Sequence, residues 1–255
     1  MTFNEFNLKD LLQKAIDEAG FKEPSPIQEQ AIPFVLAGRD IVGQAHTGTG
    51  KTAAFGLPIL NNMKGNSGVE AVVIVPTREL AMQVSDELYR FGKFLGVNTA
   101  TVYGGQAYAR QIKLIENAGI IVATPGRFLD LLRGNKIDIK PDYVILDEAD
   151  EMLDMGFLDD IKEIFTFLPK ERQTLLFSAT MPLAIKNLAK TILNNPEFIT
   201  LTKSDVTNAK ITQTFYVVDE RERDDALIRL YDYKNPSKSI IFCRTKKEVD
   251  RLSTF

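Results

Sequence analysis

A glycine-containing loop and a pair of carboxylates are the two segments of this sequence whose residue types could together perform chemistry. The loop consists of Ala45, His46, Thr47, Gly48, Thr49, Gly50, Lys51 and Thr52. Loops of this type wrap backbone N–H groups around the phosphates of a nucleotide. The closing Lys-Thr pair brings an ammonium group to the outer phosphates and a hydroxyl to Mg²⁺.

The carboxylates of Asp147 and Glu148 follow the apolar run 143–146, where a buried strand would end. The first can hold the Mg²⁺ that Thr52 touches, and the second can orient a water molecule toward the terminal phosphate. Taken singly, the loop could be a plain turn and the acids could begin a helix. However, two adjacent acids after an apolar strand are costly to place without a cation nearby. The two segments together indicate nucleoside triphosphate hydrolysis.

Short β-branched runs alternate with longer helical patterns along most of the chain. The expected strands are 40–42, 71–75, 99–103, 120–123, 143–146, 174–177 and 198–201, and the expected helices are 79–95, 110–117, 127–133, 158–167 and 183–193. Apolar strands separated by amphipathic helices form βαβ units. We therefore predict an α/β fold with a mostly parallel sheet covered by helices on both faces.

Polar segments follow directly on six of the expected strands. Two of these segments are the phosphate loop and the acids. The other four are Pro76, Thr77 and Arg78; Gly104, Gly105 and Gln106; Thr124, Pro125, Gly126 and Arg127; and Ser178, Ala179 and Thr180. Some of these residues also suit plain helix starts, because Thr caps helices and Pro opens them. In open α/β sheets, ligands bind beyond the carboxyl ends of the strands. The segments therefore predict one extended functional surface.

These motifs, in this order, resemble the DEAD-box ATP-dependent RNA helicases, specifically their first RecA-like domain and the start of the second. The resemblance includes a Q-motif at residues 20–28 with an upstream aromatic, Phe3, and it reaches residues 241–245, which are similar to the first motif of the second domain. It implies ATP and Mg²⁺ as cofactors and RNA as the partner.

The resemblance assigns roles residue by residue. Lys51, Asp147 and Glu148 are implied to be catalytic, with Thr52 and Asp147 holding Mg²⁺ largely through water, and residues 45–52 binding the phosphates. Asp150, Ser178 and Thr180 are implied to couple hydrolysis to domain movement. Phe21 and Gln28 are implied to select ATP over GTP, since a Gln amide offers the donor and acceptor that adenine's edge requires. Ser25 and Pro26 also suit the cap and first position of a helix.

RNA contact is expected at the remaining polar segments of the predicted surface. Arg78 and Arg127 are the strongest candidates, with Pro76, Thr77, Thr124, Pro125 and Gly126 beside them and Gln106 and Gln111 as weaker ones. Backbone, Thr and Arg donors to phosphates and sugars read the shape of the RNA backbone and not its base sequence. The paired glycines Gly104 and Gly105 allow close approach of the strand.

Composition limits the class of protein. The formal net charge is −3 with a pI near 5.4, so RNA binding has to come from placed contacts and not from a broadly basic surface. The single cysteine, Cys243, excludes an intramolecular disulfide and is interpreted as a core thiol. No apolar run is long enough to span a membrane, and residues 1–5 do not resemble a signal peptide. We expect a monomeric, cytoplasmic protein.

The polar stretch 202–208 predicts a linker. We expect residues 1–205 to form the ATP-binding domain and residues 206–255 to be the linker and the N-terminal fragment of a second RecA-like domain, with strands at 211–218 and 239–243, a helix at 221–231 and another from 246. Two strands and two helices bury little apolar surface, and we therefore expect residues 206–255 to pack poorly. The resemblance also implies a His-Arg…Gly-Arg segment in the second domain. These 255 residues do not contain it, because their only histidine is His46. We therefore expect weak ATP binding, little hydrolysis and no duplex separation by these 255 residues alone.

Three functional readings remain open from the sequence. The first is an RNA-stimulated ATPase that locally separates duplexes. The second is a nucleotide-gated RNA clamp with little turnover, which would use the same residues. The third, a P-loop enzyme such as a DNA translocase or a small-molecule kinase, is disfavoured by the Q-motif and by the Thr-Pro-Gly-Arg segment at 124–127.

Overall fold

The computed structural model describes residues 1–65, 68–201, 212 and 214–254. The chain divides into two compact units, Met1–Thr207 and Asn208–Phe255. The predicted linker at 202–208 lies outside the described residues. Within the described ranges, no helix is long and apolar enough to cross a lipid bilayer.

A parallel sheet forms the centre of the first unit. Its seven described strands are β1 (Ile41–Gln44), β2 (Ala71–Ile74), β3 (Thr99–Val102), β4 (Ile120–Ala123), β5 (Tyr143–Leu146), β6 (Gln173–Ser178) and β7 (Glu197–Thr200). They lie in the order β3-β4-β2-β5-β6-β1-β7, and every neighbouring pair is parallel. The predicted α/β fold with a parallel sheet is confirmed, and each of the seven strands expected between residues 40 and 201 overlaps an observed one.

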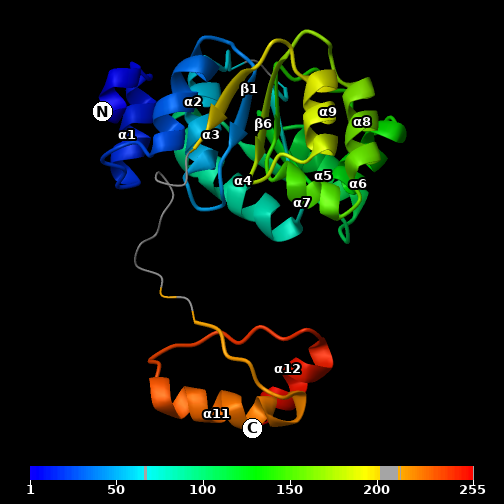
Figure 1. Cartoon of the computed structure of the whole chain (residues 1–255). Coiled ribbons are helices and arrows are strands. Elements are labelled where there is room, and N and C mark those ends of the chain that lie inside the picture. Colours follow the sequence, from blue (N-terminus) through cyan, green and yellow to red (C-terminus); the bar gives the residue numbers. More distant parts are fainter. Residues whose placement is uncertain (66–67, 202–211, 213, 255) are drawn as a thin grey trace. The chain divides into compact units, whose positions relative to one another are not determined.

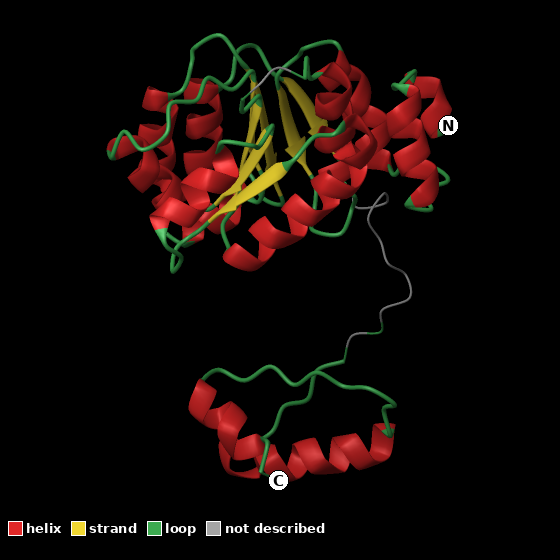
Figure 2. Cartoon of the chain, turned by 180° about the vertical axis from the view of Figure 1, so that it is seen from behind, coloured by secondary structure: helices red, strands yellow, loops and turns green. Residues whose placement is uncertain are grey.

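Helices cover both faces of this sheet, as Figures 1 and 2 show. The α-helices of the first unit are α1 (Asp10–Glu18), α2 (Pro26–Leu36), α3 (Lys51–Asn62), α4 (Arg78–Gly92), α5 (Tyr108–Ile115), α6 (Pro125–Arg133), α7 (Ala149–Asp154), α8 (Leu158–Phe167) and α9 (Leu183–Ile192), and short 3₁₀ helices span Phe3–Phe6 and Lys93–Leu95. The start of α2 and the helices α4, α5, α6, α8 and α9 were predicted from the sequence, whereas α1 and α7 were not.

Two hydrophobic clusters, one on each face, hold the layers together. Successive strand residues alternate between them: Val73 and Ile145 belong to the cluster packed by α1–α4, whereas Val72 and Val144 belong to the cluster packed by α5–α9. This alternation follows from the two-residue period of a strand. Because both faces are buried, β2, β4 and β6 consist of buried residues throughout. The resulting rigid sheet fixes where each strand ends, and hence where the polar segments lie.

The second unit contains a 3₁₀ turn at Glu220–Glu222 and the helices α11 (Arg223–Lys234) and α12 (Lys246–Leu252). Both predicted helices are present. The two predicted strands are wrong over the described residues, because 214–218 and 239–243 carry no strand. A β-strand needs a hydrogen-bonded partner, and these segments have none among the described residues.

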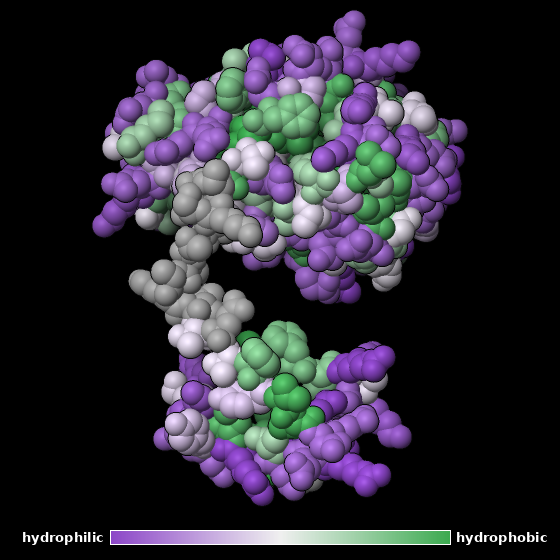
Figure 3. Space-filling model, in the orientation of Figure 1, coloured by the Kyte–Doolittle hydropathy of each residue, from purple (hydrophilic) through white to green (hydrophobic). Residues whose placement is uncertain are grey.

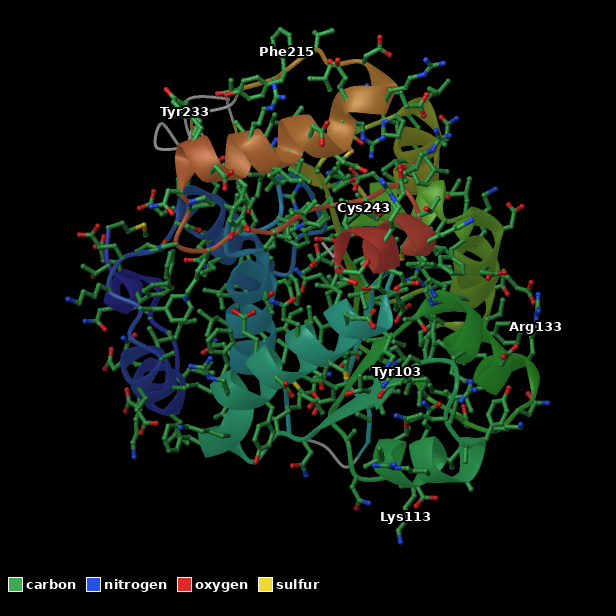
Figure 4. The ribbon with its side chains drawn as sticks, turned by 90° about the horizontal axis from the view of Figure 1, so that it is seen from below. Tyr103, Lys113, Arg133, Phe215, Tyr233 and Cys243 are labelled. Carbon is green, nitrogen blue, oxygen red and sulfur yellow. The ribbon has the colours of Figure 1, made fainter. Side chains whose placement is uncertain are left out.

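Large apolar side chains of the second unit remain in contact with solvent. Phe215 is 86% exposed and Phe242 is 91% exposed, and Figure 3 shows apolar side chains on the outside of this unit. Cys243, expected in a core, has intermediate exposure as a free thiol; it is labelled in Figure 4. The alternating apolar pattern of a strand is present here without the packing that would bury it.

Candidate nucleotide and nucleic-acid site

The six polar segments lie along one edge of the sheet. All strands are parallel, so the residues that follow β1 to β6 meet at the carboxyl edge. The strand order divides them into two groups. The phosphate loop, the acids and the Ser178 segment follow the adjacent strands β1, β5 and β6. The segments with Arg78, Gly104 and Arg127 follow the adjacent strands β2, β3 and β4. The candidate nucleotide and RNA residues are therefore neighbours along a single rim.

The phosphate loop depends on two glycines with left-handed backbone. Gly48 has φ 82° and Gly50 has φ 89°, a conformation that costs glycine little and other residues more. A Cβ on Gly50 would also lie 2.4 Å from Gln28 Nε2. The Ala45 N–H donates to the Ser178 carbonyl at 3.0 Å, and Thr49 Oγ1 donates to the His46 carbonyl at 2.8 Å. Helix α3 begins at Lys51, near the end of this loop, so its positive dipole end faces the phosphate-binding residues.

The ammonium group of Lys51 is buried beside two carboxylates. Its side chain is 5% exposed, and Nζ lies 3.1 Å from Asp147 Oδ1 and 3.8 Å from Glu148 Oε1. Despite these ion pairs, no described residue provides Nζ with a well-aligned hydrogen bond. A buried cation with unused donors is costly in isolation, so the site favours an additional anionic ligand with several acceptor oxygens.

Burial raises the pKa of Asp147, and the neighbouring Lys51 partly opposes that change. The Asp147 side chain also accepts from the Glu148 N–H at 3.0 Å. Glu148 itself has φ 56° and ψ 52°, a left-handed conformation that costs a non-glycine residue about 1–3 kcal/mol. Its Oε1 accepts a hydrogen bond from Thr47 Oγ1 at 3.0 Å. The strained backbone thus turns the Glu148 carboxylate toward the phosphate loop.

Glu87 on α4 is a site residue that sequence reasoning missed. Burial raises its pKa, while a hydrogen bond with the side chain of Thr52 and the charge of Arg90 oppose that change. A third carboxylate therefore adjoins the hydroxyl expected to bind Mg²⁺. The sequence around Glu87 gives no sign of this role, because Glu87 resembles an ordinary acid on an amphipathic helix and lies nine residues after Arg78, the nearest motif residue.

Side chains of the Q-motif donate hydrogen bonds to the backbone of the phosphate loop. Gln28 is only 2% exposed; its Nε2 donates to the Gly50 carbonyl at 3.0 Å and its Oε1 accepts from the Ser25 N–H at 2.9 Å. Ser25 Oγ donates to the Thr49 carbonyl at 2.7 Å. Pro26 occupies the first position of α2, as predicted. The Gln28 amide, expected to read adenine, is therefore also a support of the loop.

The aromatic residues of this motif pack on one another. Phe21 is partly buried, with ring centroids 6.0 Å from Phe3 and 5.8 Å from Phe91. Phe3 is almost completely buried and so is a packing residue. A groove of about 390 Å³ lined by Phe21, Gly20, Lys22 and Asp17, among others, lies at this end. It leaves an accessible space beside Phe21 in which a base could bind.

Asp150, Ser178 and Thr180 form one hydrogen-bonded group. The Asp150 N–H donates to Ser178 Oγ at 3.1 Å, and the Asp150 carboxylate accepts from the Thr180 N–H, the Thr180 hydroxyl and the Ala179 N–H. Although burial acts to raise the pKa of Asp150, these hydrogen bonds lower it overall. The structure brings together the residues predicted to couple hydrolysis to movement.

The expected RNA contacts differ in exposure. Arg78, Gly104 and Gly105 are exposed, Thr77, Gln106, Thr124, Gly126 and Arg127 are partly exposed, and Pro76 and Pro125 are buried. The side chains of the two prolines are therefore not available to a ligand. Thr77 accepts from the Leu80 N–H at 3.2 Å as the cap of α4, and Arg78 lies over the ring of Tyr103 at 4.8 Å.

Gln111 supports Arg127 and is not a surface contact. Its side chain is completely buried; Nε2 donates to the Tyr103 carbonyl at 2.8 Å, and Oε1 accepts from Arg127 Nη1 at 2.9 Å. Arg127 Nη1 also donates to the Gln106 carbonyl at 2.7 Å. Two neutral acceptors thus fix one end of the guanidinium group without neutralising its charge.

Comparison with known proteins places the chain in a family. The sequence model of the DEAD/DEAH box helicases matches residues 25–188, a range that holds the phosphate loop, the acids and the Ser178 segment. The chain belongs to the DEAD/DEAH box helicase family. The predicted resemblance is confirmed.

Curated members of this family are similar to the chain over its whole length. "DEAD-box ATP-dependent RNA helicase RhpA" of Helicobacter pylori is 57% identical over 100% of this chain and 52% of its own length. "DEAD-box ATP-dependent RNA helicase CshA" of Bacillus subtilis is 47% identical over 99% of this chain and 52% of its own length. The chain thus spans about half the length of these relatives.

A solved structure of a DEAD box protein from the hyperthermophile Methanococcus jannaschii is 42% identical, with a TM-score of 0.77, over 100% of this chain and 69% of that one. A hypothetical ATP-dependent RNA helicase from Sulfolobus tokodaii is 38% identical with a TM-score of 0.71, over 88% of this chain and 73% of that one. The α/β fold of this DEAD-box chain is therefore the fold of solved relatives.

Proposed function

We propose that this chain binds ATP with Mg²⁺ and carries the hydrolytic residues of an ATP-dependent RNA helicase. The observation that carries the proposal is the buried Lys51 ammonium next to Asp147 and Glu148, with donors left for a polyphosphate. The relatives RhpA and CshA are named as ATP-dependent RNA helicases, which supports the same activity.

The chemistry divides among four residues. Lys51 binds the outer phosphates, and Thr52 and Asp147 hold Mg²⁺ largely through water. When bound, Mg²⁺ neutralises charge that develops on the phosphates. Glu148 orients the attacking water. The fit is favourable because a polyphosphate uses the free donors of Lys51, while a cation offsets the burial that raises the pKa of Asp147.

ATP is selected over GTP by Phe21, which stacks on the base, and by Gln28, which pairs with its edge. The accessible groove beside Phe21 supports the first role. For the second, Gln28 has one N–H and one carbonyl lone pair left after its bonds to Gly50 and Ser25.

Single-stranded RNA binds along the adjacent part of the rim through its phosphates and sugars. Arg78 and Arg127 contribute charge, Gly104 and Gly105 allow close approach, and Gln106 and the backbone of 76–77 and 124–126 add hydrogen bonds. Binding of this kind is independent of base sequence. The hydrogen-bonded group of Asp150, Ser178 and Thr180 transmits the state of the nucleotide.

Residues 206–255 are, in this proposal, a linker and the beginning of a second RecA-like domain. The exposed apolar side chains there, such as Phe215 and Phe242, support it, because they need further structure to bury them. These 255 residues alone then bind ATP–Mg²⁺ weakly and turn over slowly. The protein acts as a monomer in the cytoplasm, a location supported by its single cysteine.

An ATPase assay with and without single-stranded RNA, on a version that includes a complete second domain, tests the proposal. A helicase hydrolyses ATP faster with RNA and separates a short duplex. A nucleotide-gated clamp instead retains RNA in the presence of ATP with little turnover. If the rate of ATP hydrolysis is the same with and without RNA, the helicase and the clamp are both contradicted, and another class of P-loop enzyme is indicated.

A further inference from the structure

The ring of Tyr108, in the first turn of α5, lies against two positively charged side chains. The guanidinium carbon of Arg127 is 4.2 Å from the ring centroid, and Lys136 Nζ is 3.6 Å from it. The Tyr108 hydroxyl donates to Asp130 Oδ2 at 3.2 Å, which fixes the direction of the ring. Cations over an aromatic face are attracted by its quadrupole. One ring thus positions two charges from different segments.

The end of helix α6 brings Lys136 back to this ring. After Arg133 the chain reverses through Gly134 and Asn135, which has φ 47°, and the Lys136 N–H donates to the Leu131 carbonyl at 3.0 Å. A Cβ on Gly134 would lie 3.2 Å from Lys136 Cε. The glycine therefore makes room for the lysine stem, and the helix end directs the ammonium group toward Tyr108.

The two charges on Tyr108 are not neutralised by ion pairs. Among the described residues, neither Arg127 nor Lys136 takes part in a salt bridge, and Arg127 donates to neutral acceptors. The Asp130 carboxylate accepts from the Tyr108 hydroxyl and not from either cation. The two centroid distances together put the charges within about 8 Å of each other. Such a pair favours two neighbouring anionic groups.

Surrounding residues add to this positive character. Lys113 on α5 projects outward, as Figure 4 shows, and Arg110 of the same helix is exposed. Arg133, also projecting outward in Figure 4, is instead engaged by Glu163 in a two-bond ion pair. The available charge therefore lies beside Tyr108 and along α5, next to Arg127.

We propose that Lys136 binds an RNA phosphate next to the one bound at Arg127, and that Tyr108 positions both cations. Single-stranded RNA would then continue past the end of the rim onto the surface formed by α5 and the turn after α6. The inference rests on the proposed function, because it extends the RNA contact assigned to Arg127.

Lys136→Gln tests the phosphate contact. Affinity of the 255-residue chain for a labelled single-stranded oligouridine is measured by fluorescence anisotropy at several salt concentrations. Each phosphate contact on a single strand contributes about 0.7 to the slope of log K against log salt, so the loss of affinity between 50 and 200 mM salt should shrink by about 2.6-fold. Lys140→Gln, which removes the same charge from an exposed position in the same loop, should leave the slope unchanged.

Tyr108 is tested as a positioning residue. Tyr108→Phe keeps the ring and should retain the slope, whereas Tyr108→Ala, which removes the ring from both cations, should lower the slope at least as much as Lys136→Gln does. Combining Tyr108→Ala with Lys136→Gln should add little, since both remove the same interaction. A thermal unfolding curve of each variant checks that the fold is intact. If Tyr108→Ala does not fold, the proposal is tested by Lys136→Gln alone, because Lys136 is exposed and its replacement should not disturb the fold.

The outcomes separate this inference from the proposed function. If the unmodified chain does not bind RNA, the proposed function and the inference are both overturned. If RNA binding is weakened by Arg78→Ala while Lys136→Gln keeps the slope of the unmodified chain, only the inference is overturned. Equal slope changes in Lys136→Gln and Lys140→Gln also overturn it, because they indicate diffuse charge and not a placed contact.

Discussion

Replacing Gln28 by alanine should weaken nucleotide binding in two separable ways. The change removes the bonds from Nε2 to the Gly50 carbonyl and from the Ser25 N–H to Oε1, and it leaves those groups unpaired next to the phosphate loop. Two hydrogen bonds at about 0.5–1.5 kcal/mol each give a loss of about 1–3 kcal/mol in the free energy of unfolding. The adenine edge would lose its partner as well.

The assay compares three ligands by isothermal titration with Mg²⁺ present: ATP, GTP and inorganic tripolyphosphate. Separately from this loss of stability, an adenine edge left unpaired costs about 1–3 kcal/mol of binding free energy, so the Kd of Gln28→Ala for ATP should rise about 5- to 150-fold. If Gln28 also braces the loop, the Kd for tripolyphosphate, which has no base, should rise by at least about twofold, equivalent to one weak hydrogen bond.

Ser25→Ala is the matched control, because it removes the 2.7 Å bond to the Thr49 carbonyl and leaves the Gln28 amide in place. It should weaken ATP, GTP and tripolyphosphate by similar factors. Unchanged tripolyphosphate affinity in both variants would refute the bracing role of the Q-motif. Equal affinity of the unmodified chain for ATP and GTP would refute selection of the base by Phe21 and Gln28.

Three further outcomes are expected. Glu148→Gln should keep ATP–Mg²⁺ binding and abolish hydrolysis in a version with a complete second domain, whereas Lys51→Ala should weaken binding itself; substantial turnover by the Glu148 variant would contradict the role given to that residue. Because hydrogen bonds lower the pKa of Asp150, its stabilising effect is present above the ordinary carboxyl pKa near 3.9 and lost as pH falls through the lower folded value. Asp150→Asn should therefore lower the urea midpoint at neutral pH and differ less from the unmodified chain in acid; a pH-independent difference would contradict this. Gly50→Ala should reduce thermal stability and ATP affinity more than Gly48→Ala, since both have positive φ but only the first crowds a side chain; equal effects in both assays would show that crowding is unimportant.

The strands were predictable because their cause is local. In β2 and β4, the residues are β-branched or aliphatic throughout, as is needed where both faces of a strand are covered. The capped start of α2 at Pro26 is equally local. In contrast, residues 214–218 and 239–243 have a strand-like sequence without a strand, because pairing depends on other segments and not on their own side chains.

The site was predictable as a set of motifs but not as a set of contacts. The positions of Lys51 and Asp147 followed from the rule that parallel strands end at one edge. The burial of Gln111, the proximity of Glu87 to Thr52 and the attachment of Gln28 to Gly50 depend on how helices pack on the sheet. Spacing along the chain carries no information about such packing, so these roles became visible only in three dimensions.

The position of β1 in the sheet has a consequence for how the protein emerges from the ribosome. This strand, which carries the phosphate loop, pairs with β6 and β7, so that Ile41 is aligned with Leu175 on one side and Glu197 on the other. Contacts between residues this far apart form slowly, and they cannot form before the later strands have been synthesised. A nascent chain that has completed β1 to β5 therefore has the loop sequence but no strand to hold it. We expect the capacity to bind ATP to arise late in synthesis, in one step, when the last two strands enclose the first.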